Sequence, residues 1–331
     1  MRAARRSLSF RHKRRVPHST ADAALQIELR LFDDSARRGT RKVAIRDASC
    51  LVVQTLDSLC IDGHAMAAQS SLLLHAQHRS KFLRTELVEG LRWAISRGQV
   101  AREQIDGVDW VFPRAVRDAE LIVARRIRQL AQGPPMARSE RARLEKVSFV
   151  CSSAPLGTID VLRTMLIRLN RMNRWPTLLV SGTAEAQWYR WKLGRPVSEC
   201  REWLRLGSAM QPSASHKADL SMIVLLDASR LGVEFMAEVL EAIPETSGLI
   251  VVGNPDESPT AGHGQPFRDL VSTALFQTVQ VAGLTTGTEN RLTTAPSRRS
   301  ALCWRLRRGA ALKSNLRWGP IATIQTKGEP A

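Results

Sequence analysis

The sequence lacks several features that mark common classes of protein. No stretch of about 18 consecutive apolar residues is present, so no membrane-spanning helix is predicted. The basic N-terminus has no apolar core of the kind that a secretory signal needs, and we therefore expect a cytoplasmic protein. No two cysteines are spaced as CxxC, so the sequence predicts neither a disulfide framework nor a metal site. The five cysteines are scattered along the chain: Cys50, Cys60, Cys151, Cys200 and Cys303.

Acidic residues are absent from two basic stretches, residues 1–20 and residues 291–318. Residues 1–20 contain seven Lys or Arg and residues 291–318 contain eight, so the ends supply most of the formal charge of +18. Basic ends of this kind are typical of proteins that bind polyanions. The alternative is that both ends are solvated tails without a partner.

Apolar residues recur at helical spacing in the first part of the chain and in short runs later. In RSKFLRTELVEGLRWAISRG, one predicted helix face contains Phe82, Leu83, Leu87, Leu91 and Ile95. From residue 146, short apolar runs alternate with amphipathic helices, which is typical of a parallel sheet with helices on both faces. We therefore predict an α/β protein with four parts: a basic flexible arm (1–42), a smaller, mostly helical domain (43–145), an α/β domain (146–285) and a basic tail (286–331).

Small and polar residues follow the predicted strands. The runs KVSFVC, TLLVSG, SMIVLLDAS and GLIVVGNPDES place SSAPLGT, SGTAEA, DAS and GNPDES at their carboxyl ends. Ligands of open parallel sheets bind at this edge, so we expect any binding site to be there.

Four segments together resemble one family. The segment GLIVVGNPDESPTAGHGQPFRDLVST resembles GDPDQLPSVGPGxVFRDL of RecD-type superfamily-1 DNA helicases. ADLSMIVLLDASRLGVEFMAEVLEAIP resembles the family's ADLLIVDEASMVDxxLLxxLLxALP, and LGRPVSECREWL resembles its TGRPAxTIHRLL. With WVFPRAVRDAELIVARRIRQLA, which resembles the helix that enters the family's ATPase domain, the resemblance covers roughly residues 80–285. It implies a RecA-like P-loop NTPase sheet, Mg²⁺-ATP as the family's cofactor, and DNA as its partner.

The phosphate-binding loop departs from the family. Aligned on VLR, the family's GGPGTGKTTVLR lies over SSAPLGTIDVLR. Gly157 is retained, but Thr158 replaces the Lys that contacts the β- and γ-phosphates, and Ile159 replaces the hydroxyl that binds Mg²⁺. The resemblance therefore implies a former phosphate loop that has become a structural turn.

The other nucleotide-contacting motifs also depart. The family's DEAS supplies a Mg²⁺ ligand and a water-activating Glu, where this chain has Leu226 and Asp227. The family's GDPDQ becomes GNPDE, with Asn254 as its second residue and Glu257 in place of the Gln that senses the γ-phosphate. We therefore expect no cofactor and no confident catalytic residue, with Asp227 as the one residual acidic candidate.

Tryptophan and arginine alternate near the C-terminus and in one earlier segment. Cations can follow phosphates while indoles stack on bases. The candidate residues are Trp304, Arg305, Arg307, Arg308, Lys313, Arg317 and Trp318. The alternative is a short element docked on the body, with its tryptophan buried. The segment WYRWK, with Trp188 and Trp191, and the nearby Trp203 allow the same two interpretations: stacking platform or core.

These observations lead to one hypothesis and two alternatives. The hypothesis is a catalytically degenerate RecD-like protein that binds single-stranded DNA in DNA transfer, recombination or repair, beside another helicase or a relaxase subunit. Too few residues follow 285 for a second RecA-like domain, so we do not expect translocation. The first alternative is a divergent ATP-dependent helicase subunit that a partner chain completes and that uses ATP and Mg²⁺. The second is an interaction module that does not bind DNA.

Overall fold

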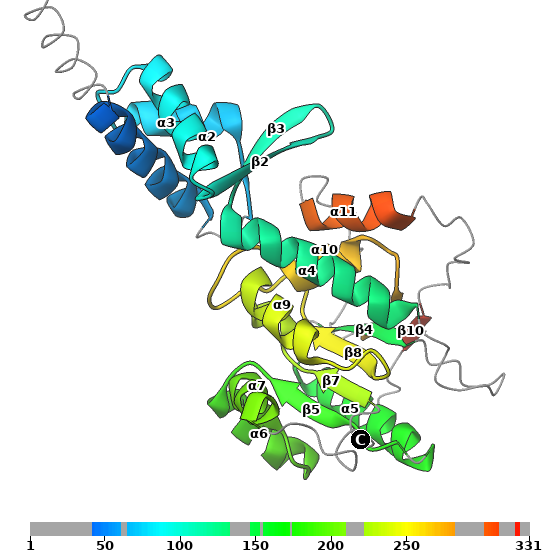
Figure 1. Ribbon diagram of the computed structural model, residues 1–331. Coiled ribbons are helices and arrows are strands. Elements are labelled where there is room, and N and C mark those ends of the chain that lie inside the picture. The colour runs from blue at the N-terminus through cyan, green and yellow to red at the C-terminus, as the bar shows by residue number, and fades with distance from the viewer. Residues whose placement is uncertain are drawn as a thin grey trace, which may run out of the picture.

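The structure is a computed structural model that describes most of the chain between residues 42 and 281 and two short segments beyond. The described residues are 42–60, 65–132, 146–152, 155–172, 174–209, 222–281, 301–310 and 322–324. The predicted basic arm therefore lies outside the described residues, apart from residue 42. A small N-terminal unit and a larger α/β unit are joined by the long helix α4 (Arg114–Ala131) (Figure 1).

A seven-stranded, all-parallel sheet forms the larger unit, with strand order β10-β9-β4-β8-β7-β5-β6. The central strand β4 pairs with β8 on one side and β9 on the other. The predicted parallel α/β sheet is confirmed. Its strands are β4 (Val147–Ser152), β5 (Thr177–Val180), β6 (Ser198–Glu199), β7 (Met222–Leu225), β8 (Gly248–Gly253), β9 (Gln277–Val281) and β10 (Ala322–Ile324).

Helices cover both faces of this sheet because its strands are apolar on both faces. In β4, Phe149 and Cys151 enter one core, whereas Val150 enters the other, as the two-residue period of a strand requires. Helices α5 (Pro155–Arg171) and α6 (Thr183–Leu193) pack on the Val150 face. The opposite face is covered by α4, α7 (Cys200–Ala209), α9 (Val233–Ala242), α10 (Pro266–Ser272) and α11 (Ala301–Ala310).

The N-terminal unit combines helices with a small antiparallel sheet. Its helices span residues 42–60, α2 (Gln69–His78) and α3 (Arg84–Ser96). Of the predicted helix face, Leu87 and Leu91 are buried, but Leu83 precedes α3 and is exposed. The sheet has the order β1-β3-β2, and its strands are β1 (Ala67–Ala68), β2 (Val100–Ile105) and β3 (Val108–Pro113).

The hairpin between β2 and β3 was not predicted, although its signal is present. Asp106 and Gly107 form a two-residue turn with φ of 51° and 78°. Asp-Gly is favoured in such turns because both positions need positive φ. The segment predicted to be mostly helical therefore also contains a sheet.

Helix α4 connects the two units through its own packing. Val123, Ile127 and Leu130 are buried in the same core as β4, β7 and β8. Arg126 donates hydrogen bonds to the carbonyl oxygens of Leu240 and Ile243 at the end of α9. The start of α4 follows β3 directly, so the small sheet is fixed to the larger unit. In the part of the chain that the structure describes, no helix is long and apolar enough to cross a membrane.

Candidate functional site

A pocket of about 470 Å³ lies at the carboxyl ends of β4, β7 and β8. Its lining includes four residues that the resemblance assigned to nucleotide contacts: Thr158, Asp227, Asn254 and Glu257. They come together because parallel strands end at one edge of a sheet. Helix α6 completes the lining with Glu185, Trp188 and Tyr189.

The connection from β4 to α5 is too short for a phosphate-binding loop. The six glycine-rich positions of the family motif align with residues 152–157. Ser152 belongs to β4 and residues 155–157 belong to α5, which leaves only residues 153 and 154 between strand and helix. The expected turn is thus corrected: Gly157, Thr158 and Ile159 lie in the first turns of α5.

The two residues that the resemblance aligns with the phosphate-binding Lys and the Mg²⁺-binding hydroxyl are both buried. Ile159 packs in the core between α5 and the sheet, with Leu162 and Val180. Thr158 is buried at the pocket wall. An aliphatic side chain at position 159 has no ligand atom for a metal, so this position cannot support Mg²⁺.

Asp227 is held by a hydrogen bond in a backbone conformation that few residues adopt. Its φ is 49°, in the left-handed region that Asp tolerates better than most residues. The hydroxyl of Tyr189 donates to Asp227 Oδ1 over 2.7 Å. Burial raises the pKa of Asp227, and the hydrogen bond from Tyr189 opposes that rise. The preceding Leu226 is fully buried, so no carboxylate stands at the family's metal position.

Arg230 is the cation of the pocket lining, and two carboxylates neutralise it. It forms an ion pair with Glu185, and its Nε lies 3.6 Å from Glu257 Oε1. The hydroxyl of Ser229 donates to Glu257 Oε2 over 2.9 Å. With Asp227, the lining holds three acids and one base. This charge balance repels a triphosphate.

Sequence reasoning included Glu185 in the predicted edge segment SGTAEA without singling it out, and it did not find Tyr189 or Arg230. Glu185 and Tyr189 lie on α6, and Arg230 belongs to the short helix η1 (Ala228–Arg230) after β7. The carboxyl-edge rule locates residues that directly follow strands, whereas helix residues reach the pocket through packing. Among the described residues, no group of three or more His, Cys, Asp or Glu side chains could hold a metal ion.

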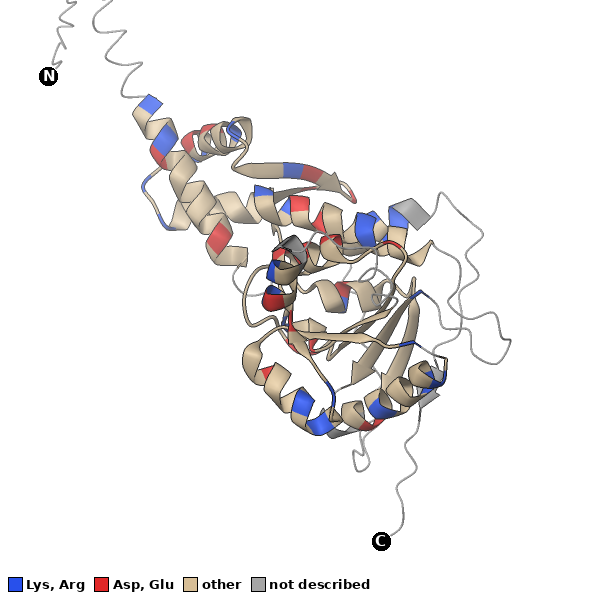
Figure 2. Cartoon of the chain, turned by 60° about the horizontal axis from the view of Figure 1, so that its bottom comes forward, with Lys and Arg blue, Asp and Glu red and all other residues tan. Residues whose placement is uncertain are grey.

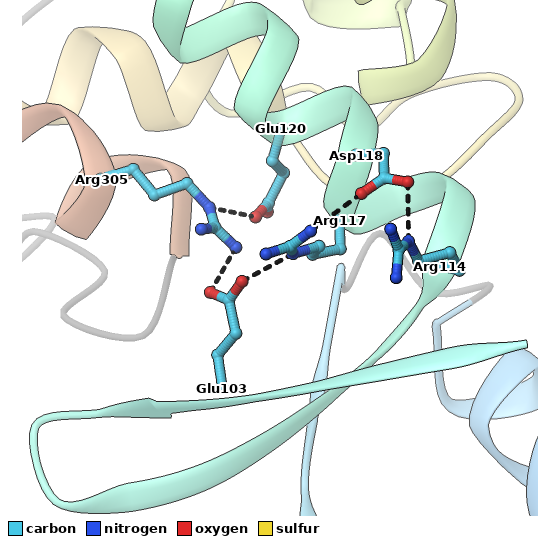
Figure 3. A network of polar contacts seen from close by, with 6 residues as sticks. All are labelled: Glu103, Arg114, Arg117, Asp118, Glu120 and Arg305. Carbon is cyan, nitrogen blue, oxygen red and sulfur yellow. Dashed lines mark hydrogen bonds and ion pairs between the residues drawn. The ribbon is translucent and has the colours of Figure 1, made fainter. Parts of the chain in front are cut away.

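The predicted nucleic-acid contact Arg305 is buried and serves a structural role instead. Its side chain is only 8% exposed, and its Nη2 lies 2.7 Å from Glu103 Oε2. Its Nε lies 3.4 Å from Glu120 Oε2. Arg117 contacts the other oxygen of Glu103 over 2.6 Å and so extends the network (Figure 3). The network continues through Asp118 to Arg114. Arg305 is therefore removed from the candidate nucleic-acid interface.

The pKa values of the two carboxyl groups beside Arg305 are shifted in opposite directions. Burial would raise the pKa of Glu103, but the hydrogen bonds from Arg117 and Arg305 hold it below its usual value. Glu120 is more deeply buried, and desolvation raises its pKa to about 8 although the charge of Arg305 opposes the rise. The network thus joins α11 to β2 and α4 through charges shielded from water.

The other residues of the predicted nucleic-acid site in the tail differ in their exposure to solvent. Trp304 is half-buried and packs against a small buried cluster that contains Phe112, Ile105 and Ala301. Arg307 and Arg308 are exposed, and the guanidinium of Arg308 lies 5.0 Å from the Trp304 ring centre. The residues outside the described part of the chain are Lys313, Arg317 and Trp318.

The tryptophans of the earlier segment also differ in their exposure to solvent. Trp188 is half-buried and meets Tyr189 edge-on, with the ring centres 4.8 Å apart. Trp203 packs against the core on the opposite face of the sheet. Trp191, in contrast, is 74% exposed. Sequence reasoning missed Trp175, which precedes β5 and is 63% exposed.

Neither the family models nor the curated proteins supply a relative of this chain. No family model matches the chain, and a search of curated proteins finds no match. The RecD resemblance therefore rests on the motifs quoted above.

Proposed function

We propose that this protein is a catalytically degenerate, RecD-like protein with a RecA-like domain, and that it binds single-stranded DNA without hydrolysing ATP. The all-parallel sheet with helices on both faces is compatible with that fold. The observation that carries the proposal is the acidic pocket at the carboxyl edge, where the family binds its nucleotide.

Three features of that pocket argue against turnover of ATP. The loop that would surround the phosphates is replaced by the start of α5. The position of the phosphate-binding Lys holds a buried Thr158. Arg230 already lies between Glu185 and Glu257, so a phosphate would have to displace a carboxylate to reach it.

The charge of the chain supports a polyanionic partner. The formal net charge is +18 and the isoelectric point is about 11. A charge of this size attracts nucleic acid at low salt, whatever its sequence. A role in DNA transfer, recombination or repair, beside an active helicase or relaxase, follows from the resemblance.

The test is a fluorescence-anisotropy titration of a labelled single-stranded oligonucleotide across a salt series, with and without Mg²⁺-ATP. We expect binding that weakens with salt, at a log–log slope of about −0.7 per phosphate contact, and that does not respond to ATP. A parallel phosphate-release assay should show no turnover. Binding that changes with ATP would instead support a helicase subunit, and no binding at low salt would support an interaction module.

A further inference from the structure

We propose that the single strand binds at the amino edge of the sheet, opposite the pocket. The contact surface, called here the amino-edge patch, consists of Trp175, Trp191, Lys192, Arg195, Arg168 and Arg171. This inference rests on the proposed function, because it assigns a surface to the nucleic-acid binding proposed above.

The chain connectivity places these residues together. Helices α5 and α6 start at the carboxyl edge and return the chain to the amino edge, where β5 and β6 begin. The last turn of α5 therefore lies at the amino edge with Arg168 and Arg171, and Trp175 follows two residues before β5. The last turn of α6 brings Trp191 and Lys192 to the same edge.

Two hydrogen bonds connect the parts of the patch. Arg163 in α5 donates to the carbonyl oxygen of Lys192 in α6 over 2.8 Å. Arg195 donates to Asn170 Oδ1 over 3.3 Å, so the residues after α6 contact the end of α5. The patch is thus one continuous surface rather than two separate ones.

Basic side chains dominate this surface. The described residues of 155–195 include seven Lys or Arg but only two acids, Asp160 and Glu185. Glu185 is paired with Arg230 in the pocket at the other edge. Figure 2 shows the same imbalance, since α5 and α6, at the bottom of that view, have mainly blue charged bands.

Two exposed indoles distinguish the patch from an ordinary pair of basic helix ends. Basic residues in a last helical turn complement the helix dipole, which accounts for Arg168 and Arg171 alone. It does not account for two tryptophans that expose 63% and 74% of their surface beside them. Large exposed apolar groups of this kind mark interaction sites.

The cations lie directly over the indoles. Lys192 Nζ is 4.0 Å from the Trp191 ring centre, and the Arg195 guanidinium carbon is 5.9 Å from the Trp175 ring centre. A base that stacks on the free part of either indole would place its phosphate near a cation. Stacked bases with cations along the backbone are how proteins bind single strands without sequence preference. In a duplex the base faces are covered, so we infer a single-stranded occupant.

The test compares two tryptophan variants in the same anisotropy titration with labelled oligothymidylate. Trp175→Ala with Trp191→Ala should raise the Kd at least about tenfold, because each stacked base contributes about 1–3 kcal/mol. The matched control is Trp93→Ala, since Trp93 on α3 has the same arrangement with Arg97 at 4.8 Å but lies in the N-terminal unit. The control should bind like the wild type.

A charge variant checks the same surface independently. Arg168→Glu with Arg171→Glu should weaken binding and make the log–log salt slope shallower by about one to two phosphate contacts. Circular dichroism and thermal melting verify that each variant is folded, as exposed positions predict.

The outcomes separate this inference from the proposed function. If the wild type does not bind, the proposed function fails. If the wild type binds and both patch variants bind equally well, the patch is wrong and the function stands. Loss of a wild-type dimer in the tryptophan variant, with unchanged DNA binding, would show a self-association surface and would also overturn the inference.

Discussion

The segment around Trp304 and the segment around Trp191 both interleave tryptophan with cations, yet one faces the interior and the other faces solvent. Trp304 is half-buried and Arg305 is enclosed between two carboxylates. Trp191 is exposed, and its neighbour Lys192 lies over the ring at the surface. The two segments are nearly indistinguishable as sequence patterns.

The difference arises from what the fold places opposite each segment. Arg305 meets Glu103 on β2 and Glu120 on α4, and the latter is 185 residues away in the sequence. The amino-edge patch has no comparable pair of carboxylates among the described residues of α5 and α6. An arginine and tryptophan pattern therefore indicates a ligand surface only when remote acids do not already satisfy the arginine.

The largest expected effect is a loss of stability when the buried Arg305 is replaced. Arg305→Met should lower the free energy of unfolding by about 3–5 kcal/mol, because it removes the buried cation that pairs with Glu103 and leaves the buried carboxyl of Glu120 without its partner. Urea denaturation measures the change. The control Arg308→Met, in the same helix but exposed, should stay within about 0.5 kcal/mol of the wild type. Equal losses of stability for the two variants would contradict the structural role that we assign to Arg305.

The pH dependence of stability should also report on the buried network. The pKa of Glu120 is about 8 in the folded protein, above the value of an unfolded Glu, so the folded state binds more protons between these values. Its contribution to stability is complete at low pH and is lost as pH rises towards 8. Glu120→Gln should therefore gain stability relative to the wild type between pH 5 and pH 8. The control Glu241→Gln changes an exposed carboxylate that pairs with Arg125, so it tests whether the trend requires burial.

The patch residues should matter little to folding. Trp175→Ala with Trp191→Ala should change the free energy of unfolding by no more than about 1 kcal/mol, because both side chains are largely exposed. Thermal or urea unfolding measures this. A loss of stability comparable to that of Arg305→Met would mean that the two tryptophans stabilise the fold. It would contradict the contrast between the buried segment and the exposed segment.

The smallest expected effect is at the pocket. Thr158→Lys should produce no ATP hydrolysis, because Ile159, Leu226 and the acids around Arg230 leave neither a metal ligand nor a phosphate site. A phosphate-release assay with Mg²⁺-ATP detects turnover. Any turnover from this single change would show that the pocket retains the catalytic groups that we assign as lost.

Local patterns predicted the sheet well, because its strands are nearly continuous apolar runs. β7 and β8 are buried on both faces, as the runs SMIVLL and GLIVVG indicate. The hairpin of β2 and β3 was missed because VAREQI and VDWVFP lack a strict alternation of apolar and polar residues, and only Asp106-Gly107 marked it. The pairing of β10 with β9 could not be predicted, since it depends on a contact between distant segments.

In the candidate site, the residues that follow strands were predicted from the sequence, and most of those on helices were not. Asp227, Asn254 and Glu257 were expected at one edge because each follows a strand. Tyr189 and Arg230 were not expected, because their positions depend on helix packing. Arg305 was assigned to the wrong role because nothing near it in the sequence reveals its two acidic partners.

The closure of the Arg305 network also sets an order for synthesis. A ribosome adds about 5–20 residues per second, so the 185 residues between Glu120 and Arg305 take about 10–40 seconds to make. During that interval Glu103 and Glu120 have no Arg305 to pair with. The contacts of Arg305 with β2 and α4 can therefore form only after α11 has left the ribosome.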